Sequence, residues 1–459
     1  MVERCQRNVI FGHYLLVSGL LGGLISPILL FNLDFERRAS FKTIVVYIPF
    51  CTQILGSVTI VFTTIALCIN KSSWIYEKQT SVVLKVKVVV ILVLGIMLCV
   101  LQQMNDYEYH STRIFSKMVK NSTLAFVFFQ TLFITWCSRF VFYETRKLKY
   151  IMSFLAVVNT VNWLDATVLT SIFITECNST DFGKDTDPLD SKSDAVDHRI
   201  IYLLSFIMEF SIQATTFVIA IPMTKDRENT RIAIPCRNHQ EHIAEMCRHV
   251  SLCRKQKLLV SVISFVLISP FLFYVAVLPT PMYNMVNYHD IWLFCIVSAK
   301  GFVFFLITIA YYVLYKNVTI RTVPVTLDFS DIALLLGTSA VTSAGVVTFL
   351  LRKDSGKFII DFHTWFNILY SVYQTIFVLF LKFIVIRDKT LQILPRVRMI
   401  VIILVTYNMF YWVKDSLFFL PFIKVDVDDR LFKFLFFLLY PLISFYRFQS
   451  AMGMIPFLS

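Results

Sequence analysis

Long apolar runs recur along the whole chain, and they limit its fold more than any other feature of the sequence. A transmembrane helix needs about 20 consecutive, mostly apolar residues, and twelve segments meet that description. Charged residues make up 16% of the 459 residues, whereas soluble proteins carry roughly 25%. The sequence therefore predicts an all-α, polytopic membrane protein with twelve transmembrane helices in a lipid bilayer.

The predicted spans form two groups of six, separated by a charged segment. The first group comprises residues 9–31, 43–69, 82–101, 119–143, 150–174 and 200–223, and the second comprises residues 258–278, 291–315, 332–351, 358–386, 397–421 and 431–451. We accordingly expect an N-terminal six-helix domain (1–223), a cytoplasmic linker (224–257) and a C-terminal six-helix domain (258–459). Because six is even, both domains would have the same orientation and would be related by an axis along the membrane normal.

Two short motifs occur once in each group of spans. The first is a Gln inside an apolar run, in FQTLF with Gln130 and in YQTIF with Gln374, about 244 residues apart. The second is an Asn with a Trp four residues later, at Asn159 and Asn408, about 249 residues apart. Both motifs fall on the fourth and fifth spans of their group. Membrane segments are low in complexity, so chance is the alternative, but the matched order favours an internal repeat.

The distribution of basic residues predicts the orientation of the chain. Lys and Arg cluster in loops that share one side if there are twelve spans, including Arg146, Lys147, Arg254, Lys255, Arg396 and Arg398. The positive-inside rule makes that side cytoplasmic, with both termini inside. The acidic loop 176–198 would lie outside. Asn121 and Asn178 begin Asn-x-Ser/Thr sequons on that outer side, so both are candidates for glycosylation.

Ionisable and amide side chains inside the spans are candidates for function, because such groups are costly in hydrocarbon. Glu209 is the clearest, a single acid in the middle of the sixth span. The alternative for Glu209, Gln130 and Gln374 is structural, since interhelical hydrogen bonds could also retain them. The acids Asp165 and Asp415 follow the Trp of each repeated motif. For these acids, neutralisation by a neighbouring residue such as Lys414 is as good an explanation as transport.

The sequence offers no support for an enzyme, a metal or a cofactor. The central segment holds Cys and His residues between Cys236 and Cys253, but their spacing matches no zinc module. The chain also lacks a Gly-rich phosphate loop and a nucleophile elbow. The net charge of +13 is explained by cytoplasmic loops, so we expect no nucleic-acid partner.

The last span ends in PLISFYRFQSAM, residues 441–452. This run, taken with the motifs above, resembles the otopetrin family of proton channels, whose last span typically ends in Pro-Leu-x-x-Phe-Tyr-Arg-Phe-His-Ser. Gln449 stands here where the family has His. The family's Glu-aromatic-Ser of the sixth span is similar to the segment from Glu209 to Ser211. The Gln-Thr and Asn-x-x-x-Trp motifs resemble the family's in both halves, so the resemblance covers most of the chain.

The resemblance implies a plasma-membrane homodimer that carries protons into the cell when the outside becomes acidic. Its implied proton pathway comprises Gln130, Asn159, Glu209, Gln374 and Asn408. Its implied structural or gating residues are Trp163, Asp165, Trp412, Asp415, Tyr446 and Arg447. Phe154 and Phe418 stand where the family commonly has a titratable His and Glu. A secondary transporter built from two six-helix repeats and a non-conducting channel homologue therefore remain the alternatives.

Overall fold

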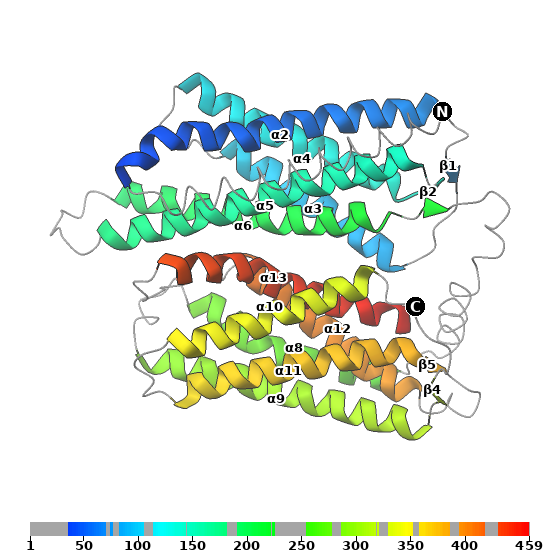
Figure 1. Cartoon of the computed structure of the whole chain (residues 1–459). Coiled ribbons are helices and arrows are strands. Elements are labelled where there is room, and N and C mark those ends of the chain that lie inside the picture. The colour runs from blue at the N-terminus through cyan, green and yellow to red at the C-terminus, as the bar shows by residue number, and fades with distance from the viewer. Residues whose placement is uncertain are drawn as a thin grey trace. The chain divides into compact units, whose positions relative to one another are not determined.

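A computed structural model of the chain describes most of the predicted spans. The described residues are 35–69, 74–76, 82–104, 113–143, 145–180, 191–221, 223–224, 254–277, 286–317, 319–320, 329–351, 358–385, 394–417 and 430–458. Within them the chain is almost entirely helical, with eleven α-helices (Figure 1). The predicted first span, 9–31, and the linker residues 225–253 lie outside the described residues.

The helices group into two compact units. The N-terminal unit comprises residues 1–231 with 419–425, and the C-terminal unit comprises residues 232–418 with 426–459. The N-terminal unit contains α2 (Phe35–Ile69), β1 (Trp74–Tyr76), α3 (Val82–Met104), α4 (Arg113–Cys137), β2 (Phe140–Tyr143), α5 (Arg146–Thr180), α6 (Ser191–Ile219) and β3 (Met223–Thr224). The C-terminal unit contains α8 (Arg254–Val277), α9 (Val286–Asn317), β4 (Thr319–Ile320), α10 (Phe329–Leu351), α11 (Phe358–Phe383), β5 (Ile384–Val385), α12 (Leu394–Leu417), α13 (Arg430–Met454) and the 3₁₀ turn η6 (Ile455–Phe457).

Eight of the described helices are long and apolar enough to cross a membrane, which fits a multi-pass membrane protein. Many of their large apolar side chains point away from the units. Phe62 on α2, Val93 on α3, Phe305 on α9 and Trp365 on α11 are each more than half exposed. In water such faces would be a liability, whereas in a bilayer they contact lipid tails. The predicted membrane class is thus supported, while the number of twelve spans is not established.

The six helix pairings within the N-terminal unit recur in the C-terminal unit. In the first unit α2 packs on α4 and α5, α3 packs on α4 and α6, and α6 also packs on α4 and α5. In the second unit α9 packs on α11 and α12, α10 packs on α11 and α13, and α13 also packs on α11 and α12. The remaining helix, α8, contacts α9 and α12.

Short strands join the same end of the helices in each unit. In the N-terminal unit β1, which follows α2, pairs antiparallel with β2, which follows α4; β3 adds to β2 in parallel. In the C-terminal unit β4, which follows α9, pairs antiparallel with β5, which follows α11. We call this end of each unit its strand end.

The strands correct three predicted spans. The runs 119–143, 200–223 and 358–386 were expected to be helical throughout, but the helices end at Cys137, Ile219 and Phe383 and strands follow. The segment FVFY of β2 explains the error. Its aromatic and β-branched residues are as apolar as a span but favour strands, so hydropathy alone does not mark the helix end.

The acidic loop was also predicted too long. Residues 176–198 were expected to form a loop, but α5 continues to Thr180 and α6 begins at Ser191. Asn178 therefore lies on the last turn of α5 and not in a loop; its side chain is outside the described part of the chain. Hydropathy identifies only the part of a helix that lies in the hydrocarbon of the bilayer. The helix itself can continue into polar residues beyond the membrane, because its backbone hydrogen bonds do not depend on hydropathy.

Gly337 allows α10 and α13 to lie against each other. A Cβ at this position would come within 2.9 Å of Tyr446 Cβ and 3.0 Å of its Cα, so backbone would have to move. Small residues at helix contacts are typical of membrane proteins because they permit such approach.

We expect Gly337→Ala to destabilise the protein by about 1–3 kcal/mol through overpacking. Thermal unfolding of the purified protein in detergent measures the change. Gly301→Ala is the matched control, because nothing lies within 4 Å of a Cβ added there. Equal midpoints for the two variants would contradict the predicted contact.

Candidate functional site

The two helices that carry the repeated Asn motif, α5 and α12, are the most buried of the candidate spans. None of the large apolar side chains described on either helix is exposed. Asn159 on α5 and Asn408 on α12 are fully buried. Each donates its Nδ2 hydrogen bond to the backbone carbonyl four residues earlier, Leu155 and Leu404, at 2.8 Å in both cases. This bond leaves the Oδ1 atom of each Asn available to a neighbouring helix.

The structure brings together one of the two predicted Gln–Asn pairs by a hydrogen bond. Gln374 on α11 donates from Nε2 to Asn408 Oδ1 at 2.9 Å. Gln130 on α4 is also fully buried, but neither atom of its amide has a hydrogen-bond partner. Asn159 Oδ1 likewise has none. The C-terminal pair is thus joined by a hydrogen bond, with Gln374 Oε1 left without a partner, whereas the N-terminal pair presents open donors and acceptors on both residues.

A second polar layer lies farther from the strand end in the N-terminal unit. Gln53 on α2 donates from Nε2 to Asn162 Oδ1 at 3.1 Å, one helical turn along α5 from Asn159. Its Oε1 accepts from Ser122 at 2.9 Å and from Thr123 at 3.0 Å, both on α4. All four side chains are neutral, and Gln53 ties three helices together. Sequence reasoning missed this layer because Gln53 belongs to no repeated motif.

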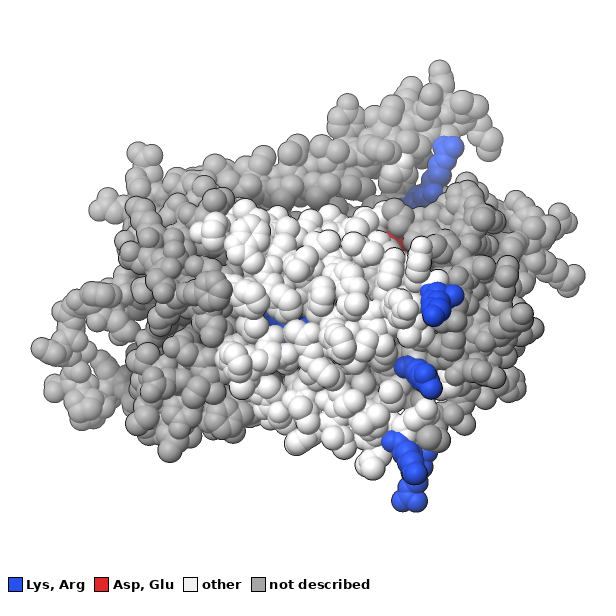
Figure 2. Space-filling model, turned by 90° about the horizontal axis from the view of Figure 1, so that it is seen from below, with Lys and Arg blue, Asp and Glu red and all other residues white. Residues whose placement is uncertain are grey.

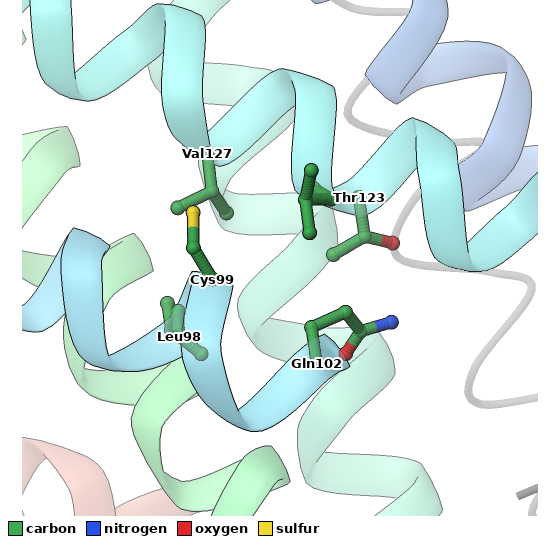
Figure 3. Close-up of a pocket in the computed structure, with 6 residues that line it drawn as sticks. Leu98, Cys99, Gln102, Thr123 and Val127 are labelled. Carbon is green, nitrogen blue, oxygen red and sulfur yellow. The ribbon is translucent and has the colours of Figure 1, made fainter. Parts of the chain in front are cut away.

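A small cavity adjoins this layer between α3 and α4 (Figure 3). It is lined by Leu98, Cys99, Gln102, Thr123, Leu124 and Val127. Its volume of about 10 Å³ is close to the least that one water molecule requires. Gln102 Oε1 is buried beside it without a hydrogen-bond partner, and the rest of the lining is mostly apolar.

The corresponding layer of the C-terminal unit is charged. Lys300 on α9 donates from Nζ to Asn367 Oδ1 at 3.0 Å and lies 2.9 Å from His363 Nε2, both on α11. Asn367 precedes Gln374 by the same seven positions that separate Thr123 from Gln130. The sequence places Lys300 within the predicted span 291–315 without a partner, and His363 and Asn367 were missed. Because Thr123 and Asn367 each lie seven residues before the repeated Gln, aligning the two motifs would have singled out Asn367 from the sequence.

Arg447 extends this charged layer from α13. Its Nη2 lies 3.5 Å from Asn367 Oδ1. Its guanidinium carbon lies 5.3 Å from the ring centroid of Tyr370, 5.7 Å from that of Tyr446 and 6.0 Å from that of Tyr411. Cation–π contacts of this kind hold a buried guanidinium. Arg447, expected from the resemblance to be structural, therefore connects the charged layer to an aromatic cage.

Other predicted structural residues of the C-terminal unit surround this cage. Asp415 pairs with the adjacent Lys414 at 3.1 Å, which is the local neutralisation that the sequence allowed. Trp412 packs on Phe448 with ring centroids 5.2 Å apart. The Tyr446 hydroxyl donates to the Ser371 carbonyl at 2.8 Å. These contacts anchor α12 and α13 against each other and against α11.

The remaining predicted residues lie in the N-terminal unit. Glu209 is buried on α6, next to Met208, whose sulfur lies 3.4 Å from the Thr167 hydroxyl of α5. Trp163 and Asp165 are half-buried on α5. Asn121 is exposed on α4, within the candidate membrane span Lys117–Cys137. The structure thus places Glu209 on a helix that packs against α5, without showing a contact to Gln130 or Asn159.

Among the residues that the structure describes, no group of three or more His, Cys, Asp or Glu side chains could hold a metal ion. The Cys and His residues of the central segment lie outside that part of the chain. No protein-family model matches the chain, and a search of curated proteins finds no significant match.

The contrast between the two Gln residues predicts different effects on stability. Gln374→Leu removes an interhelical hydrogen bond and leaves Asn408 Oδ1 without its donor, so we expect a loss of roughly 1–2 kcal/mol. Gln130→Leu removes no hydrogen bond to another side chain, so we expect no loss of stability. Thermal unfolding of the two variants in one detergent tests this, and a larger loss for Gln130→Leu would contradict the described pairing.

Proposed function

We propose that this chain is a proton channel of the otopetrin kind, built from two six-helix repeats with twelve spans. The observation that carries the proposal is the matched placement of buried amides, Gln130 and Asn159 in one unit and Gln374 and Asn408 in the other. In each unit the Gln lies on the fourth helix of the predicted group and the Asn on the fifth. In both units the Asn side chain donates a hydrogen bond to the backbone carbonyl four residues earlier.

The repeat itself is supported by packing as well as by motif order. Six helix pairings recur between the units in the same chain order, and an antiparallel strand pair joins equivalent helices in both. The helix equivalent to α8 would be the predicted first span. Two six-helix repeats in one orientation account for all of these correspondences.

Buried amides suit proton conduction because a proton needs no open pore. An amide side chain both donates and accepts hydrogen bonds, and buried polar groups without a protein partner usually bind ordered water. The free atoms of Gln130 and Asn159 would hold such water in the N-terminal unit. Gln374 and Asn408 would line the equivalent place in the C-terminal unit, and the buried acid Glu209 would relay protons beside α5.

The charge distribution supports an orientation with the strand ends in the cytoplasm. Basic residues lie where helices enter or leave the strand ends, including Lys85, Arg146, Lys147, Lys316, Lys382, Arg396 and Arg398. Figure 2 shows Lys and Arg side chains along one edge of a broad face that is otherwise almost entirely uncharged. By the positive-inside rule this edge faces the cytoplasm. The chain would then act as a homodimer in the plasma membrane with both termini inside.

Whole-cell recording tests the proposed activity. Stepping the outside of expressing cells from neutral to acid pH, with protons as the main permeant ion, should evoke an inward current. Its reversal potential should follow the proton equilibrium potential. A flux that requires and saturates with a second substrate would instead indicate a transporter. Silence with surface delivery confirmed would identify a non-conducting homologue.

Two variants test the assigned pathway. We expect Gln130→Leu to reduce the proton current at least about tenfold, because it removes the amide that would hold ordered water, and Glu209→Gln to reduce it by removing an ionisable relay. Phe128→Leu is the matched control, since Phe128 lies two residues away on α4 with its ring half exposed. If both variants reach the surface and carry the wild-type current, the pathway assignment is wrong.

A further inference from the structure

The proposed proton pathway assigns no role to the charged layer of the C-terminal unit. Three basic side chains, Lys300, Lys414 and Arg447, are buried there. Asp415 pairs with Lys414. Among the described side chains, no ion pair joins Lys300 or Arg447 to a carboxylate. We call these three residues the basic cluster. In its described part the cluster carries more positive than negative charge.

The cluster also has N–H donors without a hydrogen-bond partner. Asn367 Oδ1 accepts a hydrogen bond from Lys300 Nζ at 3.0 Å, and Arg447 Nη2 lies farther from it, at 3.5 Å. Arg447 Nε and Nη1 are buried without a hydrogen-bond partner. A guanidinium has five N–H donors and an ammonium has three. Two nitrogen atoms of Arg447 therefore lie in the protein interior without a hydrogen bond, and the buried hydroxyls of Tyr370, Tyr407 and Tyr411 are also without a partner.

A buried cation without a hydrogen-bonded counter-charge is strongly unfavourable. The faces of Tyr370, Tyr411 and Tyr446 compensate Arg447 in part, but its Nε and Nη1 atoms remain without a hydrogen-bond partner. An anion between Lys300 and Arg447 would supply both the charge and the missing acceptor. Because the rings lie only 5.3 to 6.0 Å from the guanidinium carbon, the surroundings favour a monatomic anion over phosphate.

We propose that the basic cluster binds a small monovalent anion of the chloride class, held by Lys300 and Arg447. The N-terminal unit provides the internal comparison. There Gln53 occupies the place of Lys300, and its amide is paired with Asn162, Ser122 and Thr123. That layer carries neither the excess charge nor the open donors, so the anion site belongs to the C-terminal unit alone.

Thermal unfolding of the purified full-length chain in detergent tests the site. A ligand that binds only the folded state raises the unfolding midpoint. We expect sodium chloride to raise it by about 2–4 °C over sodium gluconate of equal ionic strength, and sodium bromide to do the same. The ³⁵Cl NMR line of chloride should also broaden on addition of the protein and narrow again when bromide competes.

Lys300→Gln, which places in the C-terminal unit the residue found at Gln53, should abolish both chloride effects, and Arg447→Gln should do the same. Lys257→Gln is the control, because it removes an exposed charge from the same unit and should leave both effects intact. Equal midpoints for the wild-type protein in chloride and gluconate would overturn the proposal. So would a chloride effect that persists undiminished in Lys300→Gln, a conclusion that holds even if Arg447→Gln does not fold.

Anion binding at the basic cluster does not depend on proton conduction. Anion binding is measured on the purified protein without a proton gradient, so a silent protein with a chloride-dependent midpoint would reject the channel and keep the site. A protein that conducts protons but unfolds at the same midpoint in chloride and gluconate would keep the channel and reject the anion site.

Discussion

Each unit depends on shielding one helix from the bilayer while that helix carries polar side chains. In an apolar medium an amide is costly unless it is hydrogen-bonded. Asn159 and Asn408 meet part of this requirement within their own helices, by bonding to the carbonyl four residues earlier. The surrounding helices then cover α5 and α12 so completely that no large apolar side chain described on either is exposed. The arrangement of helices therefore follows from where the amides must lie.

The two units share this arrangement of helices but differ in the polar side chains that it encloses. In the N-terminal unit the layer around Gln53 is neutral and paired, and the open amide atoms belong to Gln130 and Asn159. In the C-terminal unit Gln374 and Asn408 are joined by a hydrogen bond although Gln374 Oε1 has no partner, and Arg447 has open donors one layer farther from the strand end. The two units thus differ in how fully the Gln–Asn pair is hydrogen-bonded and in the charge of the second layer.

Hydropathy and motif order were enough to predict most of the described helices and to place Gln130, Gln374, Asn159 and Asn408 inside them. They could not predict where helices end, because the FVFY strand is as apolar as a span. They also missed His363 and Asn367, since a single polar residue in a span gives no sign of its partner on another helix. Arg447 was singled out only through resemblance, and its aromatic surroundings depend on side chains from three helices.

The short strands have a mechanical consequence. Backbone hydrogen bonds between β1 and β2 and between β4 and β5 tether the ends of α2 to α4 and of α9 to α11. A tethered end resists separation, so any rocking of these helices must pivot about the strands, and its amplitude must grow toward the opposite end. The layers of Gln53 and Lys300 lie farther from the strands than Gln130 and Gln374 do, so the same small rotation displaces their side chains more.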